Sequence, residues 1–147
     1  MVKFVVMSRD AVESLRVAEN VKYAVLSISN TGDGPPKIRC GPNLMGVLCV
    51  QFDDALVDSV GKRSLNTAQA AQMVRFADRM VADGADVVVV HCEAGISRSA
   101  ATAAVLSACY GLDNRHLFRL PYLPNRKVLR LLSEVSDGLG EPATGAQ

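Results

Sequence analysis

The sequence predicts an α/β fold, a three-layer sandwich in which helices cover a central, mostly parallel sheet of about four strands. Short runs of β-branched and apolar residues alternate along the chain with longer segments of helical periodicity. The run from 86 to 90 is almost pure valine, which suits a strand buried on both faces. The length of 147 residues fits one domain, spanning 1–147.

The first half of the chain predicts three strands and one helix. The strands are expected where β-branched and apolar residues follow one another, at Val2–Met7, Tyr23–Ile28 and Gly46–Phe52. Ser8 is suited to cap a helix that runs to about Ala18. Between the second and third strands, Thr31–Leu44 contains three of the six prolines and predicts a long loop. Loops of that length in compact domains are usually functional.

The second half predicts one strand and mostly helices. Asn66 or Thr67 can cap an amphipathic helix to about Asp83, and the valine strand follows at Asp86–Val90. Later helices are expected at Arg98–Tyr110, which is rich in small residues and therefore buried, at Asn114–Leu120, and from Asn125 to about Ser136. The residues from about 138 to 147 are rich in glycine, proline and alanine and predict a flexible tail.

Composition and charge exclude several classes of protein. The chain is 49% hydrophobic and 21% charged, which is a globular composition. Its 16 basic and 15 acidic residues leave a net charge of +1, so we expect neither nucleic acid nor a membrane surface as partner. There is no apolar run of about 18 residues and no recognisable signal sequence, which predicts a cytoplasmic protein. The four cysteines and two histidines show no metal-ligand spacing, so we expect free thiols, no metal and no cofactor.

One segment, His91–Ser99, has the composition of a phosphate-binding loop. It lies between the valine strand and the buried helix, so successive backbone N–H groups can turn inwards at the positive end of the helix dipole. Gly95 permits the backbone angles that such a loop requires. Arg98, in the first helical turn, can bind two phosphate oxygens with its planar guanidinium. This arrangement predicts a site for a tetrahedral dianion.

Cys92 lies at the base of the same loop. The amides, the helix dipole and Arg98 all favour its thiolate, and the hydroxyl of Ser99 can donate a hydrogen bond to the sulfur. His91 can brace the loop by hydrogen bonds. A thiolate that faces a bound phosphate is a nucleophile for phosphoryl transfer.

The segment resembles the His-Cys-x5-Arg-Ser/Thr signature of the cysteine-based protein tyrosine phosphatases. It is most similar to the dual-specificity branch and to its small prokaryotic or phage relatives, and the likeness extends from about Gly46 to Tyr110. The resemblance implies that Cys92 is the nucleophile, Arg98 the phosphate clamp and Ser99 an aid to hydrolysis of the thiol-phosphate. The phosphate site would be completed by the backbone N–H groups of Glu93, Ala94, Gly95, Ile96, Ser97 and Arg98.

The resemblance also implies a general acid, an aspartate on a loop roughly 30–40 residues before the nucleophile. Asp53 and Asp54 end the third predicted strand at that distance, at the edge where parallel sheets place their sites. Alignment on the family's aspartate selects Asp54, and Asp53 is the alternative. Because adjacent strand residues point in opposite directions, only one of the two should face the pocket.

The function implied is metal-independent hydrolysis of phosphomonoesters through a phosphocysteine intermediate. The expected ligand is a phosphate or similar oxyanion, carried by a protein or peptide as phosphotyrosine and also as phosphoserine or phosphothreonine. Glu93, Ala94 and Ile96 stand where the family's inositol-lipid phosphatases carry lysines, which argues against a polyanionic head group. Two alternatives remain open, an RNA 5′-triphosphatase-like enzyme and a catalytically silent module that binds phosphoproteins.

Overall fold

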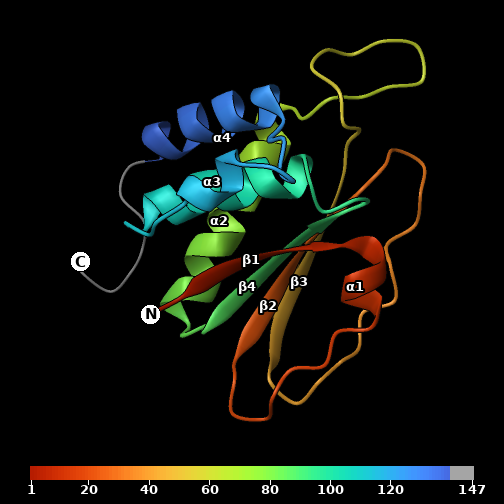
Figure 1. The fold of residues 1–147 in the computed structure, drawn as a ribbon. Coiled ribbons are helices and arrows are strands. Elements are labelled where there is room, and N and C mark those ends of the chain that lie inside the picture. Colours follow the sequence, from red (N-terminus) through yellow and green to blue (C-terminus); the bar gives the residue numbers. More distant parts are fainter. Residues whose placement is uncertain (140–147) are drawn as a thin grey trace.

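A computed structural model of the protein describes residues 1–139, in which strands and helices alternate along the chain (Figure 1). The strands are β1 (Lys3–Ser8), β2 (Tyr23–Ser29), β3 (Leu44–Gln51) and β4 (Val87–Cys92). The helices are α1 (Arg9–Glu13), α2 (Thr67–Ala82), α3 (Arg98–Cys109) and α4 (Arg126–Gly138), with a short 3₁₀-helix, η1 (Arg115–Phe118), before α4.

The four strands form one sheet in the order β1-β4-β2-β3, and every neighbouring pair is parallel. Strand β4 is therefore internal, with β1 on one side and β2 on the other. Its last residues are paired: His91 lies opposite Met7 of β1 and Ser27 of β2, and Cys92 lies opposite Ser8. Because all strands run the same way, their carboxyl ends share one edge, where α/β sheets place their sites.

Helices cover both faces of the sheet (Figure 1). Helices α2, α3 and α4 pack on one face, where Leu26 and Val90 belong to the larger core. Helix α1 lies on the other face, where Val12 packs with Val25 and Val89 in a smaller cluster. Alternate residues of the internal strands thus enter opposite cores. The predicted three-layer α/β sandwich is confirmed, and the sheet is entirely parallel.

Side-chain caps fix the starts of the longer helices. Asn66 caps α2 by accepting from the backbone N–H of Gln69, whose side chain accepts from the backbone N–H of Asn66. Asn125 caps α4 by accepting from the N–H of Val128. Both predicted helix starts are confirmed, since these caps satisfy N–H groups that have no partner inside the helix.

Three predicted boundaries are wrong. Strand β4 continues to Cys92 rather than ending at Val90, because β1 and β2 extend alongside it. Helix α1 ends at Glu13 rather than near Ala18, because Leu15 and Val17 reach the smaller apolar cluster from an irregular segment. The helix predicted to reach Leu120 is only a 3₁₀ turn that ends at Phe118, where the backbone of the next residue, Arg119, is already extended.

The predicted tail begins later than expected. Gly138 is the last residue of α4, and the N–H of Leu139 donates to the carbonyl of Val135 at 3.0 Å. Residues 140–147, the rest of the predicted tail, lie outside the described part of the chain. Within residues 1–139, no helix has both the length and the apolar character needed to span a bilayer.

Candidate active site

Gly95 sets the shape of the loop from Cys92 to Arg98. The loop connects the end of β4 to the first residue of α3, so it lies at the positive end of a helix dipole. Gly95 has a φ of +71°, and a Cβ there would lie 2.7 Å from the carbonyl carbon of Met7 and from the nitrogen of Ser8. Two features therefore require glycine at position 95: the left-handed backbone conformation and the close approach of β1.

Hydrogen bonds from neighbouring segments hold the carbonyl side of the loop. Three loop carbonyls accept backbone N–H groups from distant segments: Glu93 from Arg9 at 3.1 Å, Ile96 from Leu123 at 3.0 Å and Ser97 from Asn125 at 3.2 Å. Within residues 1–139, the backbone N–H groups of residues 94 to 97 donate to no protein acceptor. Four successive donors are thus free for an anion, as in a phosphate-binding nest.

Cys92 and Ser99 form a buried pair at the base of the loop. The Sγ of Cys92 lies 3.0 Å from the Oγ of Ser99, and the two residues are 2% and 0% exposed. When Cys92 is a thiolate it can only accept, so the Ser99 hydroxyl is then the donor. The structure thus brings the predicted nucleophile and the predicted hydroxyl donor within hydrogen-bond distance at the base of the loop.

Arg98 carries the one unsatisfied buried side-chain nitrogen in the described chain. The residue is 4% exposed, and its Nη1 donates to the carbonyl oxygen of Phe52 at 2.7 Å. Its Nε is buried without a hydrogen-bond partner in residues 1–139. Because an unpaired buried donor is costly, it indicates a place where a ligand completes the hydrogen bonding. The bond to Phe52 fixes the guanidinium beside the loop.

His91 braces the loop from inside the sheet. Its Nδ1 lies 3.3 Å from the carbonyl oxygen of Cys92, and its Nε2 lies 2.6 Å from the hydroxyl of Ser27 on β2. The carbonyl can only accept, so Nδ1 carries the proton and Nε2 of the neutral ring accepts from Ser27. Burial lowers the pKa of His91 below its ordinary value of 6.5. The ring is fully buried and neutral, which fits the predicted bracing role.

The two candidate acids, Asp53 and Asp54, have opposite surroundings. Asp53 is 5% exposed, and its carboxylate accepts the backbone N–H of Thr31 at 3.1 Å and that of Arg63 at 2.7 Å. The N–H of Arg63, followed by that of Thr31, lowers the pKa of Asp53 below 3.8 in spite of its burial. The carboxylate of Asp53 is thus bound by backbone N–H groups of Thr31 and Arg63, and within residues 1–139 it makes no hydrogen bond to the Cys92–Arg98 loop.

Asp54 is exposed and contacts that loop directly. Its Oδ1 accepts the hydroxyl of Ser97 at 2.8 Å and the side-chain amide of Asn125 at 2.7 Å. Its Oδ2 makes no hydrogen bond to any protein group in residues 1–139. One oxygen is therefore held by two donors while the other is free to carry a proton. Of the two aspartates, Asp54 is the one that lies at the predicted phosphate site.

Comparison with solved structures identifies the fold of this chain, whereas comparison of its sequence finds no match. The sequence matches no protein-family model and no curated protein. Among solved structures, human DUSP28 matches over 92% of both chains, with a TM-score of 0.62 and 19% identity. A mouse putative dual specificity phosphatase complexed with zinc tungstate matches over 82% of this chain and 72% of its own, with a TM-score of 0.55 and 20% identity. The chain has the dual-specificity phosphatase fold.

A third structure shares this fold. The human tyrosine phosphatase-like serine/threonine/tyrosine-interacting protein matches over 81% of this chain and 78% of its own, with a TM-score of 0.56 and 21% identity. The resemblance drawn from the segment around Cys92 is thereby confirmed at the level of the fold.

Sequence reasoning missed Asn125 as a residue of the site. Its side chain joins two parts of the fold: Oδ1 accepts the N–H of Val128 in the first turn of α4, while Nδ2 donates to Asp54 at 2.7 Å and to the carbonyl oxygen of Ala55 at 3.3 Å. The sequence contained part of the signal, because Pro124-Asn125 marks a helix start. It contained no sign that the cap also reaches a loop 71 residues earlier.

Proposed function

We propose that this protein is a cysteine-dependent phosphatase that hydrolyses phosphomonoesters, with phosphotyrosine in proteins as substrate and phosphoserine or phosphothreonine as further substrates. One observation carries the proposal: the sulfur of Cys92, paired with Ser99 at 3.0 Å, lies at the base of a loop with four unpaired N–H groups and beside the unpaired Nε of Arg98. A tetrahedral dianion on these donors presents its phosphorus to the sulfur.

In the first step the thiolate of Cys92 attacks phosphorus. The S–P bond forms as the ester P–O bond breaks, and Oδ2 of Asp54 gives its proton to the leaving oxygen. The guanidinium of Arg98 and the loop N–H groups stabilise the negative charge on the equatorial oxygens. The products of this step are the alcohol or phenol and phosphocysteine.

In the second step water hydrolyses the phosphocysteine. The carboxylate of Asp54 takes a proton from the water, whose oxygen attacks phosphorus as the S–P bond breaks. The Ser99 hydroxyl donates to the departing sulfur, so that Cys92 leaves as a thiolate and inorganic phosphate is released. Atoms and electrons balance without an oxidant, and the positive charge that phosphoryl transfer needs comes from Arg98 and the backbone.

The residues of the loop favour a substrate with a single phosphate. Glu93 is exposed on the loop, and neither Ala94 nor Ile96 brings a positive charge. A negative side chain beside the phosphate site disfavours a polyphosphorylated head group. The mouse putative dual specificity phosphatase is complexed with zinc tungstate, and because tungstate is a tetrahedral oxyanion, this supports an oxyanion ligand for the present chain.

The proposal is tested by hydrolysis of para-nitrophenyl phosphate and of a phosphotyrosyl peptide. We expect Cys92→Ser to lower kcat/KM at least about a thousandfold, because the nucleophile is lost. Cys109→Ser, a matched change at a half-buried cysteine outside the site, should leave the rate unchanged. Vanadate should inhibit the wild-type protein and EDTA should not.

Other outcomes would favour the alternatives. A folded wild-type protein that binds tungstate without turnover would indicate a binding module. Faster release of phosphate from a 5′-triphosphorylated RNA than from the phosphopeptide would indicate a triphosphatase. Full turnover by Cys92→Ser would exclude the covalent mechanism.

A further inference from the structure

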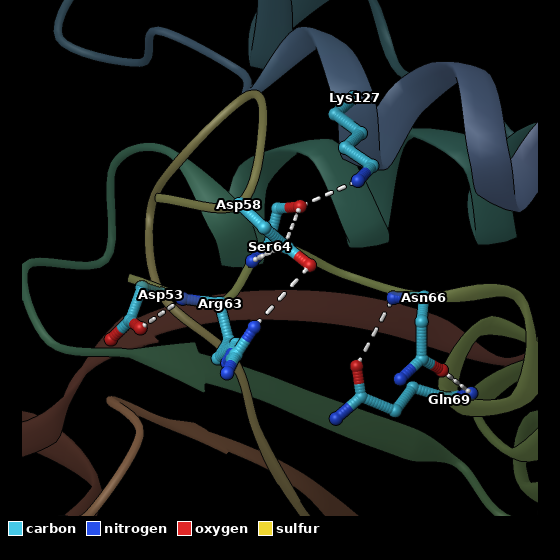
Figure 2. Close-up of polar contacts among 7 residues, drawn as sticks. All are labelled: Asp53, Asp58, Arg63, Ser64, Asn66, Gln69 and Lys127. Atoms are coloured by element: carbon cyan, nitrogen blue, oxygen red, sulfur yellow. Dashed lines mark hydrogen bonds and ion pairs between the residues drawn. The ribbon is translucent and has the colours of Figure 1, made fainter. Parts of the chain in front are cut away.

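Asp53 closes the loop that carries Asp54. The backbone N–H of Asp53 donates to the carbonyl of Arg63 at 2.6 Å, and the N–H of Arg63 donates back to Oδ2 of Asp53 at 2.7 Å (Figure 2). These two bonds join the ends of the segment 53–63. The other carboxylate oxygen, Oδ1, accepts the N–H of Thr31 at 3.1 Å, which fixes the joined ends to the segment that follows β2.

The surroundings of Asp53 are those of a structural anion. It is 5% exposed, both carboxylate oxygens are used by backbone donors, and it makes no hydrogen bond to residues 92–98 in the described chain. The mechanism proposed above gives it no role. The next residue, Asp54, is nevertheless the one whose free Oδ2 must lie where a leaving oxygen is protonated, and a misplacement of about 1 Å can lower a rate about a hundredfold.

We propose that Asp53 is a positioning residue for the general acid: its carboxylate ties Thr31 and Arg63 together and thereby sets the place of Asp54. This inference rests on the proposed phosphatase function. It assigns the two adjacent aspartates different tasks, with one holding the backbone and the other transferring the proton.

The chemistry of the contact requires a carboxylate. Thr31 and Arg63 approach different oxygens of Asp53, and both are donors. An asparagine has one acceptor and one donor group, so one of the two backbone N–H groups would face an NH₂. Asp53→Asn therefore preserves volume while it breaks one of the two anchors.

The same loop offers a matched control in Asp58. Its Oδ1 accepts both the N–H of Ser64 at 2.9 Å and the hydroxyl of Ser64 at 2.8 Å, and Lys127 of α4 donates to that hydroxyl (Figure 2). Because both donors meet one oxygen, Asp58→Asn can keep them on its amide oxygen. This variant removes the same charge from the same loop and keeps both bonds to Ser64; the contact it loses is the long ion pair between Oδ2 of Asp58 and Nη1 of Arg63, at 3.9 Å between two exposed side chains. Exposed ion pairs of this kind contribute little.

The test compares two aryl phosphates that differ in their need for an acid. Phenyl phosphate has a poor leaving group and depends on protonation, whereas a fluorinated umbelliferyl phosphate leaves readily as the anion. We expect Asp53→Asn to lower kcat/KM roughly tenfold to a hundredfold on phenyl phosphate and less than about threefold on the activated ester. Asp54→Asn should show the same pattern with a larger amplitude, and the double variant should equal Asp54→Asn alone.

Several results would overturn the inference. If Asp53→Asn lost kcat/KM equally on both esters, Asp53 would be a general structural residue and not a positioning residue for the acid. If the variant kept the wild-type kcat/KM on both esters, Asp53 would have no part in catalysis. If Asp53→Asn abolished the alkaline fall of the pH–rate profile while Asp54→Asn kept it, Asp53 would itself be the acid. Asp58→Asn should match the wild type on both esters, and an equal loss there would mean that charge rather than anchoring matters.

A second variant protects the test against loss of folding. Asp53→Glu keeps the charge and both acceptors but adds one methylene, so it shifts the loop without leaving a donor unpaired. Its loss in kcat/KM should again be larger on phenyl phosphate than on the activated ester, but smaller than that of Asp53→Asn. An equal loss on the two esters would contradict the proposal. Failure of the phosphatase function itself would look different, because the wild type would then turn over neither ester.

Discussion

The two loops that form the candidate site are held in place in different ways. The loop Cys92–Arg98 is contiguous with an internal strand and a buried helix, and one glycine with one neighbouring strand sets its shape. The loop Asp53–Arg63 projects from the end of β3 (Figure 1). Val60, between the bridged residues Ser59 and Lys62, is fully exposed. The position of this loop depends on contacts with distant segments, among them Thr31 and Asn125.

This difference separates the two halves of the chemistry. In the proposed mechanism, binding of the phosphate and attack by sulfur depend on backbone that the core fixes, whereas protonation of the leaving group depends on the side-chain contacts that hold the second loop. Changes to the first loop should therefore affect every substrate. Changes to the second loop should affect chiefly substrates whose leaving group needs an acid.

The largest effect is expected from Gly95→Ala. The new Cβ would lie 2.7 Å from backbone atoms of Met7 and Ser8, and a side chain at a φ of +71° is also strained, so the loop must shift away from β1. We expect kcat/KM to fall about a hundredfold or more on both esters, because the donors no longer converge on one position. Steady-state kinetics and tungstate binding by calorimetry would measure the loss.

Gly111→Ala is the matched control. Gly111 also has a φ of +71°, but a Cβ there has no heavy atom within 4 Å. This variant should lose about 1 kcal/mol of stability and no activity. Normal turnover by Gly95→Ala would show that the loop is not held against β1 as tightly as this comparison requires.

The same difference explains what the sequence could predict. The residues of the first loop are contiguous, so the chemistry of the segment and its resemblance to a known signature could predict roles for Cys92, Arg98 and Ser99, and the structure places Cys92 3.0 Å from Ser99. The choice between Asp53 and Asp54 stayed open, because a shift of one residue reverses the direction of a side chain. The contacts that distinguish them come from Thr31, Arg63, Ser97 and Asn125, up to 71 residues away.

A smaller effect is expected from Asn125→Ser. Serine is as good a helix cap as asparagine, but it is too short to donate to Asp54 and to Ala55, so only the contact with the acid loop is lost. We expect kcat/KM to fall about tenfold on phenyl phosphate and less on the activated ester, while the melting temperature changes by a few degrees at most.

Asn66→Ser makes the same substitution at the cap of α2, where the side chain contacts Gln69 and not the site (Figure 2). Its rates on both esters should equal those of the wild type. If Asn125→Ser behaved like Asn66→Ser, the contact between α4 and the acid loop would have no part in placing Asp54.

The boundaries that sequence analysis placed wrongly have a related cause. The extension of β4 through His91 and Cys92 follows from pairing with β1 and β2, and no local pattern in the valine run reveals it. The short α1 follows from a small apolar cluster that Leu15 and Val17 reach without a helix. In each case a distant partner overrode a local preference.

The smallest predicted effect concerns stability. His91 beside the first loop and Asp53 in the second contribute to the free energy of unfolding over different ranges of pH. Burial lowers the pKa of His91 below 6.5, so the unfolded chain takes up a proton before the folded one as the pH falls. The free energy of unfolding should therefore decrease as the pH falls below about 6.5. The pKa of Asp53 is lowered from 3.8, so its contribution is present above that value and is lost only below it.

Between pH 7.5 and 5.5 His91, at the end of β4 beside the first loop, should therefore account for the change, and Asp53 in the second loop should not. We expect the melting temperature to fall over this interval in the wild type and to fall less in His91→Gln, which has no titrating group at the position. His116→Gln, at an exposed histidine, should keep the wild-type fall, as should Asp53→Asn. Calorimetry of each variant at pH 7.5 and at pH 5.5 would measure the fall in melting temperature. An unchanged fall in His91→Gln would show that the proton is taken up elsewhere, and the burial of His91 would then not be what makes the folded protein sensitive to acid in this range.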